Sequence, residues 1–314
     1  MVQRSPNTTD GPKLNATEQY QRTITRIAQI QSHMENAPRS QRLKDKTCIV
    51  TGVGSLRGIG RASALLFAHQ GARHLYLLDF CPDHLPELES TIQQLYPDVK
   101  VTTIQADAAD EAAIAAVCKR AIDEEGRLDV FFANAGILSS KALPDLTAEA
   151  FMESMRVNSL SCFLAVKYGS QAMMHVDPSK GKNLCGGSII LTASVAGLRS
   201  GAGTIDYSAS KAAVNSIAQT SAYQLQRTDI RVNSICPGLI ETNMTKNMFD
   251  FARQRGSGSK LGQLNPLGRY GLPQEIAQMA LFLASDESSY VNGQNLAVDA
   301  GLSASHPIIP GHWA

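Results

Sequence analysis

Thr51-Gly-Val-Gly-Ser-Leu-Arg-Gly-Ile-Gly60 is a glycine-rich stretch that decides how the surrounding chain folds. An apolar strand candidate ending at Thr51 precedes it, and a helix candidate over residues 60–70 follows it. Glycine permits a tight turn and lets backbone amides approach a ligand closely, and the free N–H groups at the start of a helix favour an anion. This order of elements predicts a phosphate-binding turn. Its expected ligand contacts are Gly52, Ser55, Arg57, Gly58, Ile59 and Gly60.

An acidic residue that could hold a ribose is expected about 20 residues after the last glycine of such a turn. Asp79 occupies that position, at the end of a second strand candidate over residues 74–79. A lone G-x-G-x-x-G pattern is weak evidence, because glycine-rich turns are common between elements. The turn, its flanking elements and Asp79 together predict a dinucleotide-binding site.

Composition narrows the class of protein. The net charge of +1 gives no case for a nucleic-acid partner, and no apolar run reaches the roughly 18 residues of a membrane span. No signal peptide opens the sequence, so we expect a cytoplasmic protein without a membrane partner. The six cysteines form no C-x-x-C pair, which predicts reduced core residues and no metal site.

Short strand candidates alternate with amphipathic helix candidates from Leu43 onward. The expected strands are residues 47–51, 74–79, 100–105, 128–133, 187–192, 230–236 and 295–298. The expected helices lie near residues 60–70, 84–95, 110–125, 147–174, 206–227 and 273–285. Strict alternation predicts an α/β fold with a doubly wound, Rossmann-type sheet of seven mostly parallel strands and helices on both faces. No second core or long linker is visible, so residues 43–314 are expected to form a single domain.

Residues 1–42 form an extension in front of this domain. Its first 16 or so residues are rich in Ser, Thr, Asn and Pro, a composition typical of disorder. Residues 17–36 have the pattern of a helix with one narrow apolar stripe, and we expect that helix to dock on the body or on a neighbouring subunit. The stripe consists of Ile24, Ile27, Ile30 and Met34.

Residues that can move a proton follow the expected strands, where ligands bind in such a sheet. Tyr207 and Lys211 are four apart, so they share one face of a helix, and an ammonium beside a phenol favours the phenolate. This pair could act as a general acid–base on an alcohol oxygen, and Ser194 could hydrogen-bond the same oxygen. The spacing alone proves little, since Tyr96 and Lys100 share it across a proline.

These motifs in combination resemble the classical short-chain dehydrogenase/reductase family. The resemblance covers residues 43–303 and includes the 13-residue interval between Ser194 and Tyr207 (207 − 194). The motifs that carry it are the glycine turn, Asn134-Ala-Gly136, Ser194, Tyr207-x-x-x-Lys211, Pro237-Gly238, Gly268-Arg-Tyr-Gly-Leu-Pro273 and Val298-Asp-Ala-Gly301.

The resemblance implies a role for each matching residue. Tyr207 would exchange a proton with the substrate oxygen, which Ser194 would orient and polarise. Lys211 would hold the nicotinamide ribose and favour the Tyr207 phenolate, so both residues also face the cofactor. Asn158 matches the asparagine that sustains a proton relay through water. The remaining cofactor contacts would be Asp107 at the adenine, Asn134, Ala135, Gly136, Pro237, Gly238 and Thr242.

Several of these residues also have a purely structural interpretation. Asn158 could be a polar helix residue bonded to backbone, and Ser194 an ordinary hydroxyl at a strand end. Asp107 could cap the next helix, and Asn134 could be a turn former. Asp206, directly before Tyr207, is interpreted as a helix N-cap. A last group could form an apolar lid over the substrate or a packed helix face: Met244, Met248, Phe249 and Phe251.

The chain departs from the family pattern in two places. Five residues, Val53 to Arg57, separate the first glycine of the turn from Gly58, where the family has three. The N-terminal extension is also unusual for the family.

Two residues disagree about the cofactor. Asp79 favours NAD, because a carboxylate accepts hydrogen bonds from a ribose diol and repels a 2′-phosphate. Arg57 resembles a basic position of NADP-dependent relatives. NAD is preferred, with NADP as the alternative, since a carboxylate against a phosphate costs more than an exposed arginine returns.

The resemblance implies an oxidoreductase that interconverts a secondary alcohol and a ketone. No cluster of Arg or Lys suggests a charged substrate, so an uncharged, fairly apolar one is expected. A homodimer or homotetramer through the helices near 147–174 and 206–227 is expected by resemblance. Two alternatives remain: a non-catalytic dinucleotide-sensing or scaffold protein, and a reductase of C=C or C=N bonds.

Overall fold

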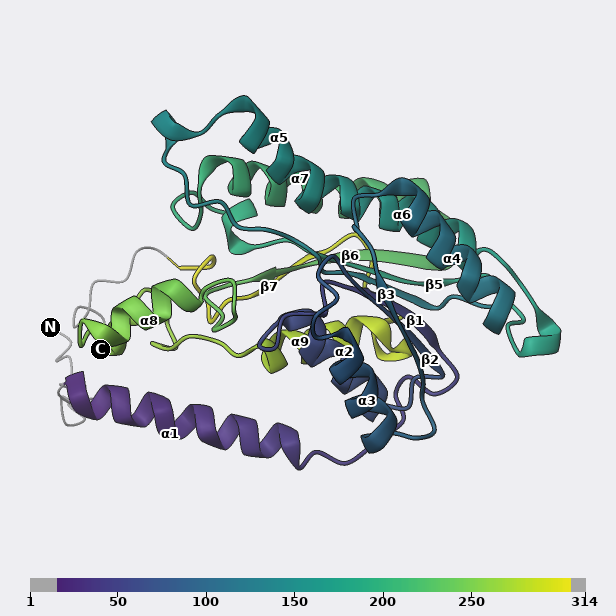
Figure 1. The fold of residues 1–314 in the computed structure, drawn as a ribbon, viewed down its shortest axis with the longest axis horizontal. Helices are drawn as coiled ribbons and strands as arrows, with labels where there is room; N and C mark the ends of the chain where they lie inside the picture. The colour runs from purple at the N-terminus through teal and green to yellow at the C-terminus, as the bar shows by residue number, and fades with distance from the viewer. Residues whose placement is uncertain (1–15, 306–314) are drawn as a thin grey trace, which may run out of the picture.

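Each strand expected from the sequence is present in the computed structural model, which describes residues 16–305 (Figure 1). The strands are β1 (Thr47–Thr51), β2 (His74–Asp79), β3 (Lys100–Gln105), β4 (Val130–Ala133), β5 (Gly187–Thr192), β6 (Ile230–Pro237) and β7 (Asn295–Val298). Within the described residues they form one sheet of seven strands in the order β3-β2-β1-β4-β5-β6-β7. All neighbouring pairs are parallel, which confirms the predicted doubly wound fold.

Helices cover both faces of the sheet because successive strand residues point to opposite sides. Val50 and Phe132 pack with α2, α3 and α9 on one face, whereas Ile49 and Phe131 pack with α4, α6 and α7 on the other. The helices of the described chain are α1 (Ala16–Glu35), α2 (Ile59–His69), α3 (Leu85–Leu95), α4 (Glu111–Glu125), α5 (Ala148–Met155), α6 (Ser161–Met173), α7 (Ile205–Gln224), α8 (Lys246–Gln254) and α9 (Pro273–Ala284). The apolar runs of the strands are therefore buried from both sides.

The strand order reverses direction between β1 and β4, which lie side by side in the middle of the sheet. Chain segments leaving these two strands turn to opposite faces, and a crevice opens at their carboxyl ends. The glycine-rich turn follows β1, so it lies at the place where such folds bind a ligand.

The helix expected over residues 147–174 is interrupted. A π-helical turn, Arg156–Leu160, separates α5 from α6. Side chains of this turn bond outside their own helix: Asn158 bonds to Ile137, and Ser159 donates to the main-chain oxygen of Ser210 at 2.9 Å. These contacts come from distant segments, so a helical sequence pattern does not show them.

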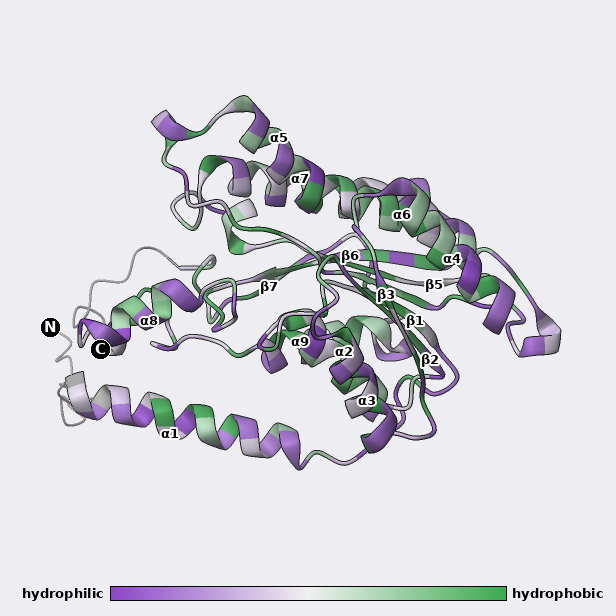
Figure 2. Ribbon diagram, in the orientation of Figure 1, coloured by the Kyte–Doolittle hydropathy of each residue, from purple (hydrophilic) through white to green (hydrophobic). Residues whose placement is uncertain are grey.

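Residues 16–35 of the N-terminal extension form α1, which lies along α8 (Figure 1). Figure 2 shows hydrophobic turns of α1 between hydrophilic ones. Ile27 is buried in a cluster that also contains Phe249 of α8, and Ile30 and Met34 are partly buried against this cluster. The expected disorder of the first residues falls mainly on residues 1–15, outside the described part. No helix among residues 16–305 is long and apolar enough to cross a membrane.

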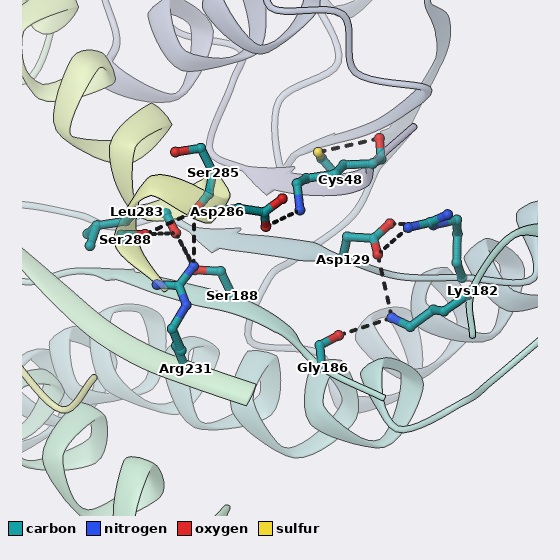
Figure 3. Close-up of polar contacts among 12 residues, drawn as sticks. Cys48, Asp129, Lys182, Gly186, Ser188, Arg231, Leu283, Ser285, Asp286 and Ser288 are labelled. Atoms are coloured by element: carbon teal, nitrogen blue, oxygen red, sulfur yellow. Dashed lines mark hydrogen bonds and ion pairs between the residues drawn. The ribbon is translucent and has the colours of Figure 1, made fainter. Parts of the chain in front are cut away.

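A group of buried charges joins the strands at the amino end of the sheet, opposite the crevice (Figure 3). Asp129 accepts hydrogen bonds from the Thr47 amide at 2.8 Å and from Arg127 at 2.8 and 2.9 Å. The Lys182 ammonium donates to the main-chain oxygens of Leu128 and Gly186 at 2.6 and 3.0 Å. These charges are satisfied by backbone and by each other, so they stabilise the start of the strands.

Candidate active site

A cavity of about 580 Å³ lies at the carboxyl ends of the strands. Its walls come from the glycine turn, the ends of β2, β4 and β5, the start of α7 and the segment after β6. Of the predicted site residues it is lined by Gly52, Ser55, Gly58, Ile59, Asp79, Asn134, Ala135, Gly136, Ser194, Tyr207, Lys211, Pro237, Gly238 and Thr242. The fold thus brings the proposed proton-transfer residues and the dinucleotide turn into one cavity.

The glycine turn is shaped as a cradle for a phosphate. Gly52 has φ +74°, and a Cβ on it would lie 2.8 Å from the Cα of Ala135. A Cβ on Gly60 would lie 2.2 Å from the main-chain oxygen of Gly52, so Gly60 serves close packing and does not line the cavity. Gly58 is the N-cap residue of α2, and because it has no side chain it cannot accept hydrogen bonds from the first N–H groups of the helix. These N–H groups are therefore left free for a ligand in the cavity. These features fit a dinucleotide pyrophosphate.

The lengthened turn is tied to Asp79. The amide of Gly54 donates to Oδ2 of Asp79 at 2.7 Å, and the amide of Cys81 donates to Oδ1 at 2.9 Å. A Cβ on Gly54 would lie 2.9 Å from Cγ of Asp79, so only glycine fits against this carboxylate. Both carboxylate oxygens are therefore held in place at the cavity wall.

Arg57 is exposed and does not line the cavity. A hydrogen bond from Lys246 is the largest cause of a lowered pKa at Asp250 of α8, and the charge of Arg57 adds a smaller contribution in the same direction. Arg57 thus lies at the outer edge of the turn, on the side of α8.

Asn134 connects three strand ends. Its Nδ2 donates to the main-chain oxygens of Thr51 and Gly52 at 3.2 and 3.1 Å, and its Oδ1 accepts from the Thr192 hydroxyl at 3.1 Å. Asn134 also lines the cavity. It therefore braces the glycine turn, which is more than the turn-forming role that its sequence context suggests.

Ser194, Tyr207 and Lys211 meet in the cavity wall. Lys211 is 3% exposed, and its Nζ donates to the main-chain oxygen of Thr192 at 2.7 Å. The same Nζ lies 5.7 Å from the centre of the Tyr207 ring. Oγ of Ser194 accepts from the Ala196 amide at 3.1 Å, which orients the hydroxyl at the end of β5. This arrangement can place an acid–base, a cation and a hydroxyl around one oxygen atom.

Asn158 lies behind the cavity wall, fully buried in the π-helical turn. Its Oδ1 accepts from the Ile137 amide at 2.8 Å, and its Nδ2 donates to the Ile137 oxygen at 3.1 Å and to Oγ of Ser210 at 3.0 Å. A Cβ on Gly136 would come within 3.0 Å of Oδ1. The side chain thus holds the segment after β4 against α7, as the backbone-bonded interpretation expects.

Asp107 does not cap α4; that interpretation was wrong, because the N-cap is Asp110. Asp107 accepts from the Ala109 amide and pairs with Nη1 of Arg156 at 2.8 and 2.7 Å. Burial raises the pKa of Asp107, but these two partners outweigh it and lower the pKa overall. Asp107 lines an adjoining cavity of about 330 Å³ that shares Asp79 with the main one.

The N-cap interpretation of Asp206 was also wrong. Thr204 is the N-cap of α7, and the fully buried Asp206 accepts a hydrogen bond from the Ser154 hydroxyl of α5.

The apolar residues after β6 were expected to form either a lid over the substrate or a packed helix face, and each interpretation holds for one of them. Met244 lines the cavity, whereas Phe249 is buried in the cluster that contains Ile27 of α1. Met248 and Phe251 are exposed.

Sequence reasoning did not assign some of the cavity residues. They are Gly54, Cys81, Thr192, Ala193, Ile240, Asn243 and Thr245. Gly54 lies within the glycine turn and Thr192 lies two residues before Ser194, so these neighbouring motifs could have indicated both residues. No sequence signal marks Cys81.

The six cysteines are free, but the prediction that all of them are core residues was wrong for two. Cys81 is exposed and Cys185 is partly exposed. Among residues 16–305, no group of His, Cys, Asp or Glu side chains could hold a metal ion.

Comparisons with known proteins find similar sequences and a similar fold. Residues 52–303 match the family model described as Enoyl-(Acyl carrier protein) reductase. The chain is 37% identical over 261 residues to the 3-oxoacyl-(acyl-carrier-protein) reductase FabG of Thermotoga maritima, covering 83% of this chain and 99% of that protein. It is 35% identical over 270 residues to levodione reductase of Leifsonia aquatica, covering 84% and 97%. A crystal structure of levodione reductase matches with a TM-score of 0.74 at 34% identity, covering 84% of this chain and 100% of that one.

Proposed function

This chain belongs to the classical short-chain dehydrogenase/reductase family of oxidoreductases, and from that premise we propose that it interconverts a secondary alcohol and a ketone with NAD. One observation carries the proposal: Ser194, Tyr207 and Lys211 line the same cavity as the glycine turn. A non-catalytic scaffold has no need of this combination, because a dinucleotide can bind without an acid–base. Fold likeness alone would not support an activity.

The cavity residues divide into parts that would hold the dinucleotide. The glycine turn and the open end of α2 would hold the pyrophosphate, and Asp79 would accept from the adenosine ribose. Lys211 would hold the other ribose, and the wall at Pro237 and Thr242 would face the nicotinamide. Asp107, in the adjoining cavity, is placed for the adenine side. When bound, NAD supplies the acceptor or donor of a hydride.

The protein's own side chains would handle the proton. During ketone reduction Tyr207 would donate its hydroxyl proton to the substrate oxygen, and during alcohol oxidation it would accept that proton. Ser194 would donate a hydrogen bond to the same oxygen as charge develops on it. Lys211, fixed by the Thr192 carbonyl, would keep a positive charge near the Tyr207 ring.

The position of Asp79 favours NAD over NADP. Its carboxylate is held at the cavity wall by two backbone amides, so it cannot turn away from a 2′-phosphate without losing them. Arg57 is exposed outside the cavity and is poorly placed to neutralise that phosphate.

The substrate is proposed to be uncharged and fairly apolar. Among the described residues that line the cavity, Asp79 and Lys211 are the charged ones, and both are assigned to the dinucleotide. Ile240 and Met244 supply apolar surface on the remaining wall. Two relatives are named as reductases of a 3-oxoacyl group and of levodione, which is in keeping with a carbonyl substrate.

Reduction of a C=C bond is the second candidate, because the matching family model is described as an enoyl reductase. Ser194 and Tyr207 favour an oxygen-centred reaction, since both carry a hydroxyl group and line the cavity. Incubation with NADH and an α,β-unsaturated ketone separates the two: the proposal requires the allylic alcohol, whereas the saturated ketone would support the second candidate.

Self-association is proposed through α5, α6 and α7. Met152, Leu160 and Phe163 expose apolar surface around a hollow of about 790 Å³ on this face. Burying that surface between two copies would form a homodimer, or one interface of a homotetramer. Light scattering of the protein and of Phe163→Glu measures this: a shift of the variant toward monomer is expected, and an unchanged mass would refute the interface.

The first experiment titrates the purified protein with NADH and with NADPH in the absence of substrate. Tighter NADH binding is expected from the position of Asp79. Tighter NADPH binding would reverse the cofactor assignment, and binding of neither would favour the scaffold alternative. A panel of secondary alcohols with NAD then tests turnover.

A further inference from the structure

Residues 16–41, here called the N-terminal strap, run from the segment that follows β6 to the end of α2. Ile27, Ile30 and Met34 of α1 pack into a separate hydrophobic cluster with residues of the segment that follows β6. The buried members on that side are Phe249, Leu261, Tyr270 and Leu272. Phe249 is 1% exposed, so the strap completes its burial. Near the start of α1, a Cβ on Gly258 would lie 3.4 Å from the Tyr20 hydroxyl.

The other end of the strap is fastened to the dinucleotide half of the domain. Arg39 forms two hydrogen bonds to the carboxylate of Asp98, at 3.0 and 2.7 Å, and its Nε donates to the main-chain oxygen of His69 at 2.8 Å. Ser40 donates to Oε1 of Gln70 at 2.7 Å. Figure 1 shows α1 extending from beside α3 to beside α8. The strap therefore bridges the end of α2 and the segment after β6.

The segment under the strap is continuous with the cavity wall. Gly238 and Ile240 line the cavity, whereas Leu239 between them packs against the strap cluster. Thr245 stiffens the bend before α8: its hydroxyl donates to the Ile240 oxygen at 2.6 Å and accepts from the Thr242 amide at 3.0 Å. A displacement of Leu239, which faces the strap, would therefore also displace its neighbours Gly238 and Ile240, which face the cavity.

Without the strap, helix α8 would lose part of its apolar support, whereas the backbone at Leu239 and Glu241 would stay hydrogen-bonded to Gly271. Helix α8 is nine residues long, and so short a helix depends on tertiary packing for its stability. Its opposite face, with Met248 and Phe251, is exposed. The packing of Phe249 and Ala252 toward α1 and Tyr270 is therefore its main apolar support.

We propose that the strap is a positioning element that holds residues 239–261 in place as the substrate side of the cavity, while the dinucleotide side does not depend on it. This inference rests on the proposed function for the identity of the two sides. The glycine turn is fixed by hydrogen bonds to Leu78 and Asp79 of β2, so the turn and Asp79 keep their geometry when the strap is released.

A double variant of the full chain, Ile27→Asp with Ile30→Asp, tests the proposal. The matched control is Gln31→Asp, which introduces the same side chain at an exposed position of α1. Amide hydrogen exchange over residues 239–261 should accelerate by about tenfold or more in the double variant and stay unchanged in the control. The Kd for NADH should stay within about twofold, and KM for the alcohol should rise about fivefold or more.

Unchanged exchange over residues 239–261, or acceleration spread evenly over the sheet, would overturn the proposal. An unchanged KM despite local acceleration would overturn the substrate-side assignment. Exchange is measured without substrate or cofactor, so its outcome is independent of the proposed reaction, which fails separately if the parent protein binds neither dinucleotide. If the double variant does not fold, Met34→Ala, which only shortens a partly buried side chain, is measured in the same way.

Discussion

The amide of Gly54 donates a 2.7 Å hydrogen bond to the carboxylate of Asp79, and this contact joins the glycine turn to the residue proposed to hold the adenosine ribose. The turn has two residues more than the family pattern, yet it contacts Asp79 directly. A change at either residue is therefore expected to alter pyrophosphate binding and nucleotide preference together.

Replacement of Asp79 tests whether its negative charge sets the nucleotide preference. In Asp79→Asn the amide oxygen can still accept from Gly54, but the negative charge is gone, so the ratio of NADPH to NADH affinity should rise by about tenfold. Asp79→Ala should show the same relaxed preference and a weaker affinity for both dinucleotides, because the turn loses its acceptor. Fluorescence titration measures both constants, and an unchanged ratio in Asp79→Asn would show that the charge does not set the preference.

Removal of the Tyr207 hydroxyl should abolish turnover. Tyr207→Phe keeps the ring beside Lys211 but cannot transfer a proton, so kcat should fall by about 10²-fold or more. The Kd for NADH should stay within about twofold, because the hydroxyl is not needed to shape the glycine turn. A large loss of NADH binding would refute the assigned role. Tyr168→Phe, a tyrosine bonded to Glu111 away from the cavity, is the matched control.

Asn134→Ala removes the brace between the ends of β1, β4 and β5. Two carbonyl oxygens, of Thr51 and Gly52, lose their donor, so the free energy of unfolding should decrease by about 1–3 kcal/mol. NADH affinity should also fall, because the turn is held less firmly. Urea denaturation and NADH titration check the two effects against Asn183→Ala at an exposed position. A stable variant with full affinity would exclude the bracing role.

Acid stability should depend on Glu125 at the end of α4. Burial raises the pKa of this carboxyl, but hydrogen bonds from Lys100, Arg73 and His74 outweigh it and lower the pKa from 4.5 to about 2. Because the folded-state pKa is depressed, the stabilisation is present above about pH 4.5 and is lost as pH falls toward 2.

The matched variant for this prediction is Glu125→Gln, which keeps the shape and removes the charge. It should lower stability at neutral pH by on the order of 2 kcal/mol and show a flatter loss of stability below pH 4.5. Thermal unfolding at a series of pH values measures both effects. If the stability of the two proteins falls equally with pH below 4.5, other carboxylates govern acid unfolding.

The sequence by itself determined the sheet and most of the cavity lining. Apolar runs such as Ile189-Ile-Leu191 are typical of strands buried on both faces, and parallel strands bring their carboxyl ends to one edge. Residues that follow those ends, such as Ser194 and Asn134, must then lie near the glycine turn. Local composition and spacing were sufficient to predict the strands and the residues at their ends, because strand burial and strand direction depend on the residues of each strand itself.

Only the tertiary structure decided the contacts between segments far apart in the chain. The π-helical turn at Asn158 depends on bonds to Ile137 and Ser210, and the orientation of Asp107 depends on Arg156. The docking of α1 likewise follows from Phe249, which the chain reaches more than 200 residues later (249 − 27 = 222). A periodic pattern shows that a helix has an apolar stripe, but the surface that buries the stripe exists only once the domain has folded.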